Sequence, residues 1–156
     1  MNLRIGFGYD IHRLIKEREL FLGGIKIPSR LGLEGHSDAD VVLHAICDAI
    51  LGALSMGDIG EHFPDTDDNL KNIRSTIILE KVKKMASFKV QNLDITIVTE
   101  TPMLSPYKQR IRESIADILG VDKEIVSVKA KRNEGVGLIG EKKAIACFVI
   151  VLLVLQ

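Results

Sequence analysis

The sequence predicts an α/β fold of the α+β sandwich type, with one mixed β-sheet that carries helices on one face. Three observations predict this class. Segments with the alternation of strands follow segments with helical spacing along the chain. Hydrophobic residues make up 46% of the 156 residues, which is enough for a sizeable core. No repeat, low-complexity tract or linker divides the chain, so we expect residues 1–156 to form a single domain.

The first quarter of the chain is expected to form two strands and then a helix. Leu3–Ile11 and Leu20–Ile27 have strand character, and a proline follows the second segment. After a glycine-rich loop, Ser37 and Asp38 are natural N-caps. They predict a helix that begins near Asp38, runs through apolar residues at helical spacing from Val41 to Ala53, and is ended by Gly57.

The middle of the chain is expected to contain a loop, two helices and a strand. Asp58–Asn69 is polar and rich in turn formers, whereas Ile73–Ala86 is amphipathic. Val90–Thr99 alternates between apolar and polar residues, which is typical of a strand. Ser105 and Pro106 have the character of an N-cap and a first helical residue, and they predict a helix that a glycine ends.

Two further strands are expected near the C-terminus. Ile125–Lys131 alternates, and a glycine-bearing loop over Asn133–Lys143 follows it. Ala144–Leu155 contains no charged residue but is too short to cross a bilayer as a helix. We expect this last segment to be a strand that is buried on both faces.

Composition narrows the class of function. Lys and Arg total 21 and Asp and Glu total 21, so the formal net charge is zero. Proteins that bind bulk nucleic acid usually carry a basic excess, so we expect no nucleic-acid partner. At zero net charge, copies of the chain do not repel one another electrostatically, so self-association is possible. Two cysteines among apolar neighbours, and an N-terminal segment without signal-peptide character, indicate a reduced cytoplasmic protein with no membrane partner.

A candidate metal site lies in the first 62 residues of the chain, where all four histidines occur. Asp10 and His12 are two residues apart on a predicted strand and therefore share a face. With His44 from the helix they form a set of one carboxylate and two imidazoles, which suits Zn²⁺ with one open position. Asp40 or Asp48, one turn away, is a candidate partner for the second ring nitrogen of His44. The alternative is a strand-end turn beside an ordinary polar helix face.

Two other segments have residues suited to substrate binding. The carboxylates of Gly57–Gly60 and Phe63–Asp68 could receive sugar hydroxyls or a cation, or they could be solvated turns. The basic residues within 129–132 could bind phosphate, and Glu134 could join Mg²⁺ that bridges phosphates. A solvated turn is the alternative for this segment also.

Read together, these motifs resemble one enzyme family along nearly the whole chain. The segments that carry the resemblance are Arg4–His12 (RIGFGYDIH), Leu22–Pro28 (LGGIKIP), Gly32–Asp40 (GLEGHSDAD), Leu43–Ala45 (LHA), Gly57–Gly60 (GDIG) and His62–Asp67 (HFPDTD). They are similar to those of the 2-C-methyl-D-erythritol 2,4-cyclodiphosphate synthases of non-mevalonate isoprenoid synthesis. The resemblance implies a lyase that converts 4-diphosphocytidyl-2-C-methyl-D-erythritol 2-phosphate to the cyclic diphosphate and releases CMP. It also implies a homotrimer around a central β-lined axis, with active sites at the subunit interfaces.

The resemblance assigns residues to each part of this site. It implies that Asp10, His12 and His44 bind Zn²⁺, and that Glu134 binds Mg²⁺ or Mn²⁺ together with substrate phosphates. It implies that His36 steadies the reacting phosphate, and it places Arg132 where the family has a catalytic threonine. The substrate-binding positions that it implies are Ser37, Asp58, Ile59, Gly60, Phe63, Pro64, Asp65, Thr66 and Asp67, and, from a neighbouring subunit, Thr99, Glu100, Thr101, Pro102, Met103, Leu104, Ser105, Ala130, Lys131 and Asn133.

The sequence departs from the family near its C-terminal third. Arg132 replaces the threonine, and its guanidinium could bind phosphate with more charge and a different reach. Met103 replaces a lysine of the cytidine loop, and Leu138 and Glu141 replace an aromatic residue and an arginine. We therefore expect no isoprenoid diphosphate in the trimer cavity. Two other functions stay open: a metal-dependent binding protein without turnover, and a phosphoryl-transfer enzyme for another nucleotide.

Overall fold

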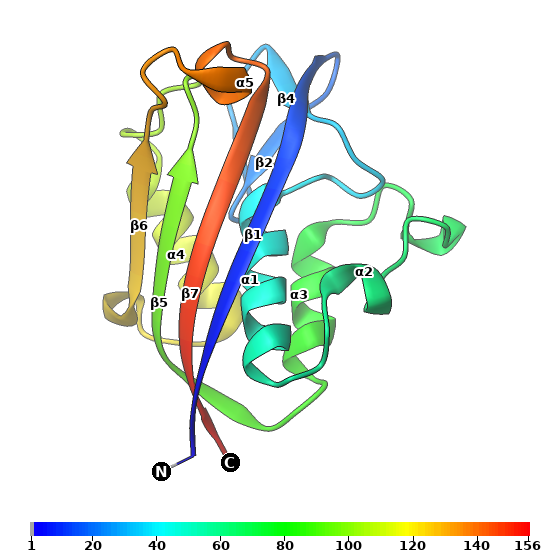
Figure 1. The fold of residues 1–156 in the computed structure, drawn as a ribbon, viewed down its shortest axis with the longest axis vertical. Coiled ribbons are helices and arrows are strands. Elements are labelled where there is room, and N and C mark those ends of the chain that lie inside the picture. The colour runs from blue at the N-terminus through cyan, green and yellow to red at the C-terminus, as the bar shows by residue number, and fades with distance from the viewer. Residues whose placement is uncertain (1) are drawn as a thin grey trace.

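A computed structural model describes residues 2–156 as a mixed sheet covered by helices (Figure 1). The elements are β1 (Leu3–Lys16), β2 (Leu20–Leu22), β3 (Ile25–Ile27), β4 (Leu31–Leu33), α1 (Val41–Ala53), α2 (Ile59–His62), η1 (Asp68–Leu70), α3 (Ser75–Lys83), β5 (Phe88–Val98), α4 (Lys108–Leu119), η2 (Lys123–Ile125), β6 (Val126–Lys131), α5 (Gly137–Gly140) and β7 (Ala144–Leu155).

The main sheet has five strands in the order β4-β1-β7-β5-β6. Strand β7 lies in its centre, antiparallel to both β1 and β5, whereas β6 runs parallel to β5. Helices α1, α3 and α4 lie behind one face of this sheet (Figure 1). The predicted fold class, a mixed sheet with helices on one face, is therefore confirmed. None of the described helices is long and apolar enough to cross a membrane.

The structure corrects several predicted element boundaries. Leu20–Ile27 is not one strand but the hairpin β2–β3, because Gly23 and Gly24 take positive φ angles of 64° and 85° and turn the chain. Leu31–Leu33 forms the short strand β4 where a loop was predicted. The helix α1 is capped by Asp40 rather than by Ser37 or Asp38.

The later elements also differ from the predicted boundaries at their ends. The residue before α4 is Tyr107, not Ser105, and its side chain makes no capping hydrogen bond. Gly120 ends α4 in a left-handed conformation, as predicted. Strand β7 has the predicted bounds, but it is buried on both faces only over its first residues, because Phe148 and Ile150 are exposed.

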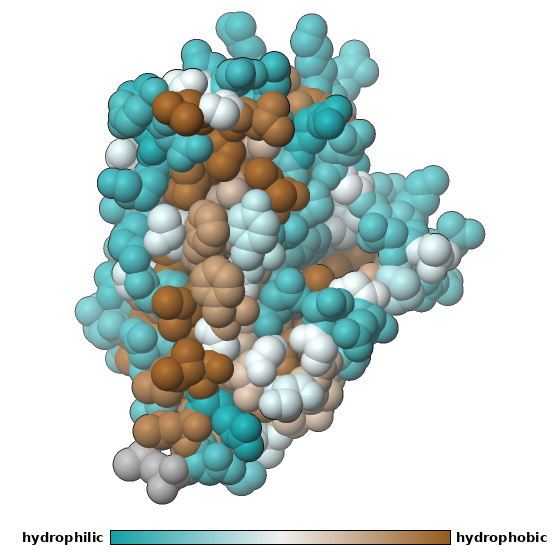
Figure 2. Space-filling model, viewed as in Figure 1, coloured by the Kyte–Doolittle hydropathy of each residue, from teal (hydrophilic) through white to brown (hydrophobic). Residues whose placement is uncertain are grey.

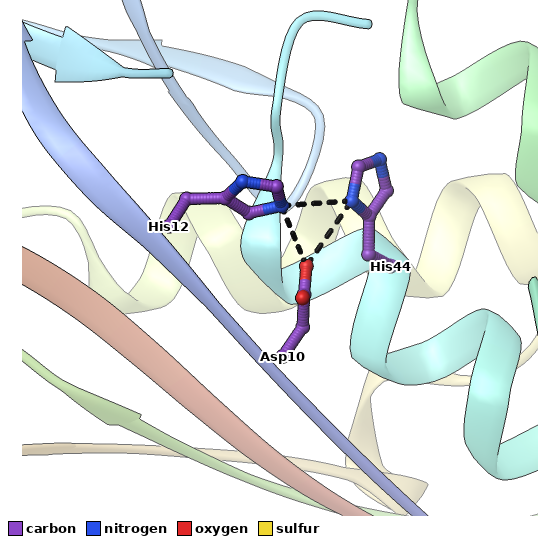
Figure 3. A group of neighbouring side chains, drawn as sticks. All are labelled: Asp10, His12 and His44. Atoms are coloured by element: carbon purple, nitrogen blue, oxygen red, sulfur yellow. Dashed lines mark hydrogen bonds and ion pairs between the residues drawn. The ribbon is translucent and has the colours of Figure 1, made fainter. Parts of the chain in front are cut away.

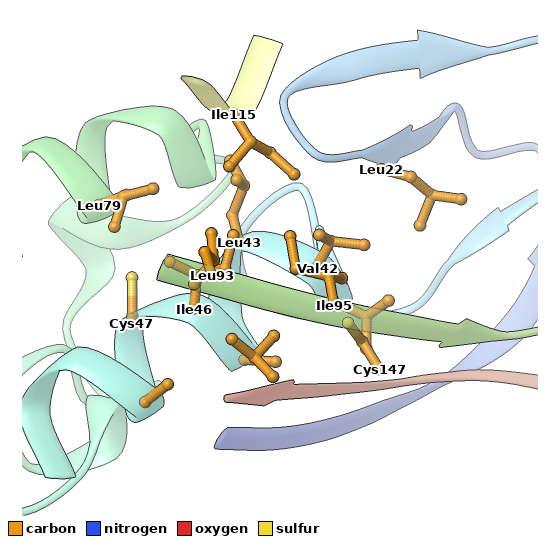
Figure 4. Packing of buried hydrophobic residues seen from close by; sticks show 14 of the residues in the cluster. Leu22, Val42, Leu43, Ile46, Cys47, Leu79, Leu93, Ile95, Ile115 and Cys147 are labelled. Carbon is orange, nitrogen blue, oxygen red and sulfur yellow. The ribbon is translucent and has the colours of Figure 1, made fainter. Parts of the chain in front are cut away.

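Helix α1 is the centre of the core, and it packs directly against β1. Its residues from Val41 to Leu43, together with Ala45, Ile46 and Ile50, are fully buried (Figure 4). Gly6 and Gly8 of β1 make the close approach possible, since a Cβ at either position would lie 1.8 or 1.9 Å from a carbonyl oxygen of α1. Because Gly6 and Gly8 have no side chains, the backbone of β1 can lie directly against α1.

The other face of the sheet is apolar and lacks a covering layer within the described chain. Its exposed side chains are Leu3, Ile5, Phe7, Tyr9 and Ile11 of β1 and Phe148 and Ile150 of β7. Figure 2 shows them as a column of hydrophobic residues over these two strands. Contiguous exposed apolar surface of this kind is typical of a protein–protein contact.

A methyl group at Gly8 tests the close approach. Gly8→Ala places a Cβ 1.9 Å from the Ala45 carbonyl oxygen, so the free energy of unfolding should fall by about 3 kcal/mol or more. Gly52→Ala is the control, because its nearest atom lies 3.9 Å away; in a helix it should stabilise by up to about 1 kcal/mol. Urea unfolding measures both changes, and equal stability of Gly8→Ala and wild type would contradict this account.

Candidate functional site

Asp10, His12 and His44 converge between β1 and α1 (Figure 3). Asp10 and His12 share the face of β1 that Gly6 and Gly8 turn towards the helix, and His44 comes from the first turn of α1. The Asp10 Oδ2 atom lies 2.9 Å from His12 Nε2 and 3.1 Å from His44 Nδ1, and these two nitrogens are 3.3 Å apart. In the described part of the chain, this is the group of side chains that could hold a metal ion.

The donor atoms fit a zinc ion. Tetrahedral zinc with bonds of about 2.0–2.1 Å places neighbouring ligand atoms about 3.3–3.4 Å apart. His12 Nδ1 donates to the Glu34 carbonyl oxygen at 2.8 Å, so its Nε2 lone pair faces Asp10 and His44. Three atoms with lone pairs at this separation repel one another unless a cation lies among them. The cluster therefore has the chemistry of a metal centre.

Charge in the cluster shifts the protonation of its members. Burial alone would raise the pKa of Asp10. In the acid range where the carboxyl titrates, the metal-free imidazoles that carry both protons donate hydrogen bonds to Asp10 and add positive charge, and His12 and His44 together lower the Asp10 pKa from 3.8 to about 2. Burial acts against a charged His12, yet the hydrogen bond and charge of Asp10 raise the His12 pKa. The carboxylate therefore stays ionised and available as a ligand at neutral pH.

A cavity of about 360 Å³ opens beside the cluster. Its polar lining includes the three cluster residues, and its other walls come from the loops on either side of α1 and from α2 and α3. The sequence-predicted residues that line it are Asp10, His12, His36, Ser37, His44, Ile59, Gly60, Phe63, Pro64 and Asp65. Its volume is within the range of small-molecule sites.

Several predicted substrate residues have structural contacts of their own. His36 lines the cavity, and its Nε2 donates to the Asp67 carbonyl oxygen at 2.9 Å. Asp58 caps α2 by accepting from the Glu61 amide, and Asp67 caps η1 by accepting from Asn69. Asp58, Thr66 and Asp67 do not line the cavity. Asp58 and Asp67 thus make the turn contacts that the alternative interpretation of this loop expects, and their predicted substrate contacts stay a prediction.

The other half of the predicted site lies apart from the metal cluster within one chain. Asp10 is level with Cys147, Ile97 and Ala130 on successive strands, so three strand spacings, about 14 Å, separate it from Ala130. The segment 99–105 lies at the same end of the sheet as Lys131, because the Thr99 amide donates to the Lys131 carbonyl oxygen. Glu134 is exposed and does not belong to the cluster.

Within this second half, the segment 99–105 contains both buried and exposed side chains. The Thr101–Pro102 peptide bond is cis, and both residues line a separate cavity with Lys16 and Arg30. Met103 is 73% exposed, whereas Leu104 is buried in the core, so that the Leu104 side chain is turned away from any ligand.

Arg132 forms an ion pair that the sequence did not predict. Its guanidinium lies 3.1 Å from Glu100 Oε2, and the Asn133 amide donates to Glu100 Oε1 at 2.7 Å. Burial would raise the pKa of Glu100, but Arg132 and the Asn133 amide lower it. The Arg132 side chain is still 64% exposed, so a second anion can reach it.

The partners of His44 differ from those predicted. Asp40 is fully buried and accepts from the amides of Gly23, Gly24, Val42 and Leu43, and Asp48 accepts from the Ile59 amide. Neither holds the second ring nitrogen of His44. That nitrogen faces the hydroxyl of Ser75 instead, at 2.9 Å, and Ser37 at 3.2 Å. No spacing in the sequence links Ser75 to His44, 31 residues away.

The fold and the site together define a metal-binding α/β protein with a cavity of ligand size beside its metal centre. A family model described as the YgbB family matches residues 3–154, and the chain belongs to this family.

Relatives and solved structures agree with this membership. A 2-C-methyl-D-erythritol 2,4-cyclodiphosphate synthase of Fusobacterium nucleatum is 50% identical over 97% of this chain and 96% of its own length. The structure of IspF from Plasmodium falciparum in complex with CDP is 38% identical, with a TM-score of 0.86 over 99% of this chain and 97% of that one. The bifunctional IspDF of Campylobacter jejuni gives a TM-score of 0.91 at 39% identity; the match covers 97% of this chain but 42% of that protein.

Removal of the helical histidine tests the metal assignment. His44→Ala should reduce bound zinc to background while the circular dichroism spectrum stays that of a folded protein. His62→Ala is the matched control, because His62 donates to the Met56 carbonyl oxygen outside the cluster and should leave zinc content unchanged. Elemental analysis of purified proteins measures both, and undiminished zinc in His44→Ala would refute the assignment.

The lowered pKa of Asp10 predicts a pH dependence of stability in metal-free protein. A carboxylate with a pKa of about 2 in the folded chain and 3.8 in the unfolded chain contributes about 2 kcal/mol above pH 4. This contribution is lost as the pH falls towards 2. The stability difference between wild type and Asp10→Asn should therefore shrink over this range by about that amount. A difference that is constant with pH, measured by denaturant unfolding, would be inconsistent with the cluster.

Proposed function

We propose that the chain is a metal-dependent cyclodiphosphate synthase. It would convert 4-diphosphocytidyl-2-C-methyl-D-erythritol 2-phosphate to 2-C-methyl-D-erythritol 2,4-cyclodiphosphate and release CMP. The observation that carries the proposal is the carboxylate and two-imidazole cluster at the edge of the cavity, in a chain that is 50% identical to a synthase of this name. The donor set supports Zn²⁺ as the ion.

The reaction requires positioning rather than a protein nucleophile. An oxygen of the 2-phosphate attacks the β-phosphorus of the same molecule, the bond from that phosphorus to the bridging oxygen breaks, and CMP leaves with the bridging oxygen. The chain must fold the substrate back and hold the attacking and leaving oxygens roughly in line. Zn²⁺ bound by Asp10, His12 and His44 would supply positive charge that offsets the repulsion between phosphates.

Residues of the cavity would bind the rest of the substrate. His36 and Ser37 border the cluster and would contact the reacting phosphate. The amide groups of the α2 segment and the neighbouring Phe63–Asp67 loop would face the ribose and methylerythritol. His36 would have to exchange its bond with the Asp67 carbonyl oxygen for the phosphate, so substrate binding would also loosen this loop.

We further propose a homotrimer in which each active site uses two chains. Two observations support it: the exposed apolar face of β1 and β7, and the separation of about 14 Å between Asp10 and Ala130 within one chain. A neighbouring chain would bring Thr99–Ser105 and 130–134 to the metal cluster, with the cytidine in the former segment. Residues 1–156 would form one domain, and the bacterial origin of the close relatives supports a cytoplasmic enzyme.

The second metal and the second cation are also part of this proposal. Glu134 would bind Mg²⁺ or Mn²⁺ jointly with substrate phosphates, since these ions prefer few carboxylates together with phosphate oxygens. Arg132 would bind a phosphate from the position where the family has threonine. Its pairing with Glu100 supports this role, because the ion pair holds the guanidinium at the strand end while more than half of the Arg132 side chain stays exposed.

Phosphorus NMR of purified protein with Mg²⁺ and the cytidine diphosphate substrate tests the function. We expect the signals of CMP and the cyclic diphosphate to appear together. Unchanged substrate, with zinc bound, would favour a binding protein that does not turn over. Thermal-shift titration with CMP, AMP and UMP tests the nucleotide, since a real ligand raises apparent stability by mass action. Equal protection by all three would contradict the cytidine assignment.

The proposed contact between Arg132 and a substrate phosphate predicts a loss of kcat/KM when Arg132 is replaced. A charge-assisted contact with phosphate contributes about 1.5–3 kcal/mol, so Arg132→Ala should lower kcat/KM by about 10–100-fold. Arg132→Lys should retain part of the rate. Lys123→Ala is a control for loss of a paired surface cation, because Lys123 pairs with Glu113 far from the cavity. An Arg132→Ala enzyme as fast as wild type would show that the guanidinium does not contact substrate.

A further inference from the structure

Behind the metal cluster, a chain of hydrogen bonds leads from His44 into the buried interior. We propose that Ser75 and Asp38 are positioning residues, which hold the His44 ring so that its Nδ1 lone pair faces the metal. The inference rests on the proposed metal-dependent function but concerns residues outside the lining of the cavity beside the cluster. Ser75 lies outside the motifs named above, and Asp38 lies within the Gly32–Asp40 motif but has no role assigned at the metal site. Ser75 is fully buried, and Asp38 is 8% exposed.

The contacts form one continuous path. His44 Nδ1 faces Asp10 and His12, while His44 Nε2 lies 2.9 Å from Ser75 Oγ. The Ser75 hydroxyl makes a short hydrogen bond to Asp38 Oδ1. Asp38 is therefore joined to the metal cluster through a single hydroxyl and a single imidazole ring.

The Asp38 carboxylate, at the buried end of the path, determines which atom donates in each hydrogen bond of the path. The Asp38 carboxylate can only accept, so the Ser75 hydroxyl must donate to it. The Ser75 oxygen is then left to accept, and its partner is His44 Nε2, which must carry the ring proton. Neutral imidazole has one proton, so Nδ1 is left with its lone pair. This is the state that a metal requires of a histidine ligand.

The Asp38 carboxylate is itself held from several sides. Its Oδ2 atom accepts from the Ser75 amide and from Arg74 Nε, each at 3.0 Å, and its Oδ1 atom also accepts from the Asp40 amide at 3.1 Å. It thereby caps α3, which lacks a capping side chain at its own N-terminus. Four donors, one of them the Arg74 guanidinium, hold this carboxylate in place, so it can fix the position of the Ser75 hydroxyl.

A second hydroxyl near the same nitrogen does not complete such a path. Ser37 Oγ lies 3.2 Å from His44 Nε2 and accepts from the Ala39 amide, and it has no buried carboxylate behind it. It lines the cavity, where substrate can compete for it. The geometry therefore favours Ser75 over Ser37 as the group that orients the ring.

Without the Ser75 hydroxyl, only the Ser37 hydroxyl remains near His44 Nε2. A hydroxyl with no carboxylate behind it can donate as well as accept, so it does not select one ring tautomer. Loss of such an outer partner of a metal-binding histidine lowers metal affinity by about 10–100-fold in other proteins. Ser75→Ala adds no atoms to the core and retains the amide that Asp38 accepts, so the cap of α3 can persist. We expect its zinc affinity to fall by that factor.

The test measures the zinc Kd of metal-stripped protein by competition with a chelator. Ser114→Ala is the matched control: Ser114 donates its hydroxyl to the Gly23 carbonyl oxygen at 2.7 Å on α4, outside the cluster. Wild type and Ser114→Ala should bind equally, and Ser75→Ala should bind 10–100-fold more weakly. Equal affinity of all three proteins would overturn the inference while leaving the metal site intact. If wild type binds no zinc, the proposed function fails together with the inference.

A second readout does not depend on metal binding. Long-range proton–nitrogen NMR of the metal-free wild type reports which nitrogen of His44 carries the proton, with the signal assigned by its loss in His44→Ala. We expect the Nε2-protonated form in wild type and a mixture of both forms in Ser75→Ala. A ring protonated on Nδ1 in wild type would overturn the proposal directly.

Discussion

The approach of helix α1 to strand β1, with no side chain between the backbones at Gly6 and Gly8, is the constraint on which the site depends. The two glycines are spaced two residues apart, so they and the next alternate residues, Asp10 and His12, face the same helix. His44 follows the cap of that helix by one turn. A bulkier strand would lift the helix, and its histidine would no longer reach the carboxylate.

The hydrogen bonds of His12 and His44 on the sides that face away from Asp10 determine which ring nitrogens are free to bind a metal ion. His12 is held by a backbone carbonyl, and His44 faces a serine that in turn donates to a buried carboxylate. Each imidazole has one nitrogen bound on its far side and one free on the side of Asp10. The cluster therefore presents an anion and two neutral lone pairs to the cavity, and the apolar packing of α1 and the sheet keeps this arrangement rigid.

Much of this could be predicted from the sequence because it depends on local periodicity. The strand pair Asp10 and His12, the helical His44 and the mixed sheet all follow from spacing along the chain. The β2–β3 hairpin was missed although its two consecutive glycines between apolar runs are a hairpin signal, because each of its strands has only three residues. Strand β4 is also too short to show a period. Ser75 and the Arg132–Glu100 pair join residues more than 30 positions apart, which only the packing of elements brings together.

Zinc K-edge X-ray absorption on the purified protein tests most directly whether β1 and α1 together build a metal centre. The account predicts one zinc per chain with only nitrogen and oxygen neighbours at about 2.0–2.1 Å, two of them with the outer-shell scattering of imidazole, and a further light atom in the open position. Sulfur at about 2.3 Å, or a single imidazole, would contradict it, because neither cysteine belongs to the ligand group and both histidines do.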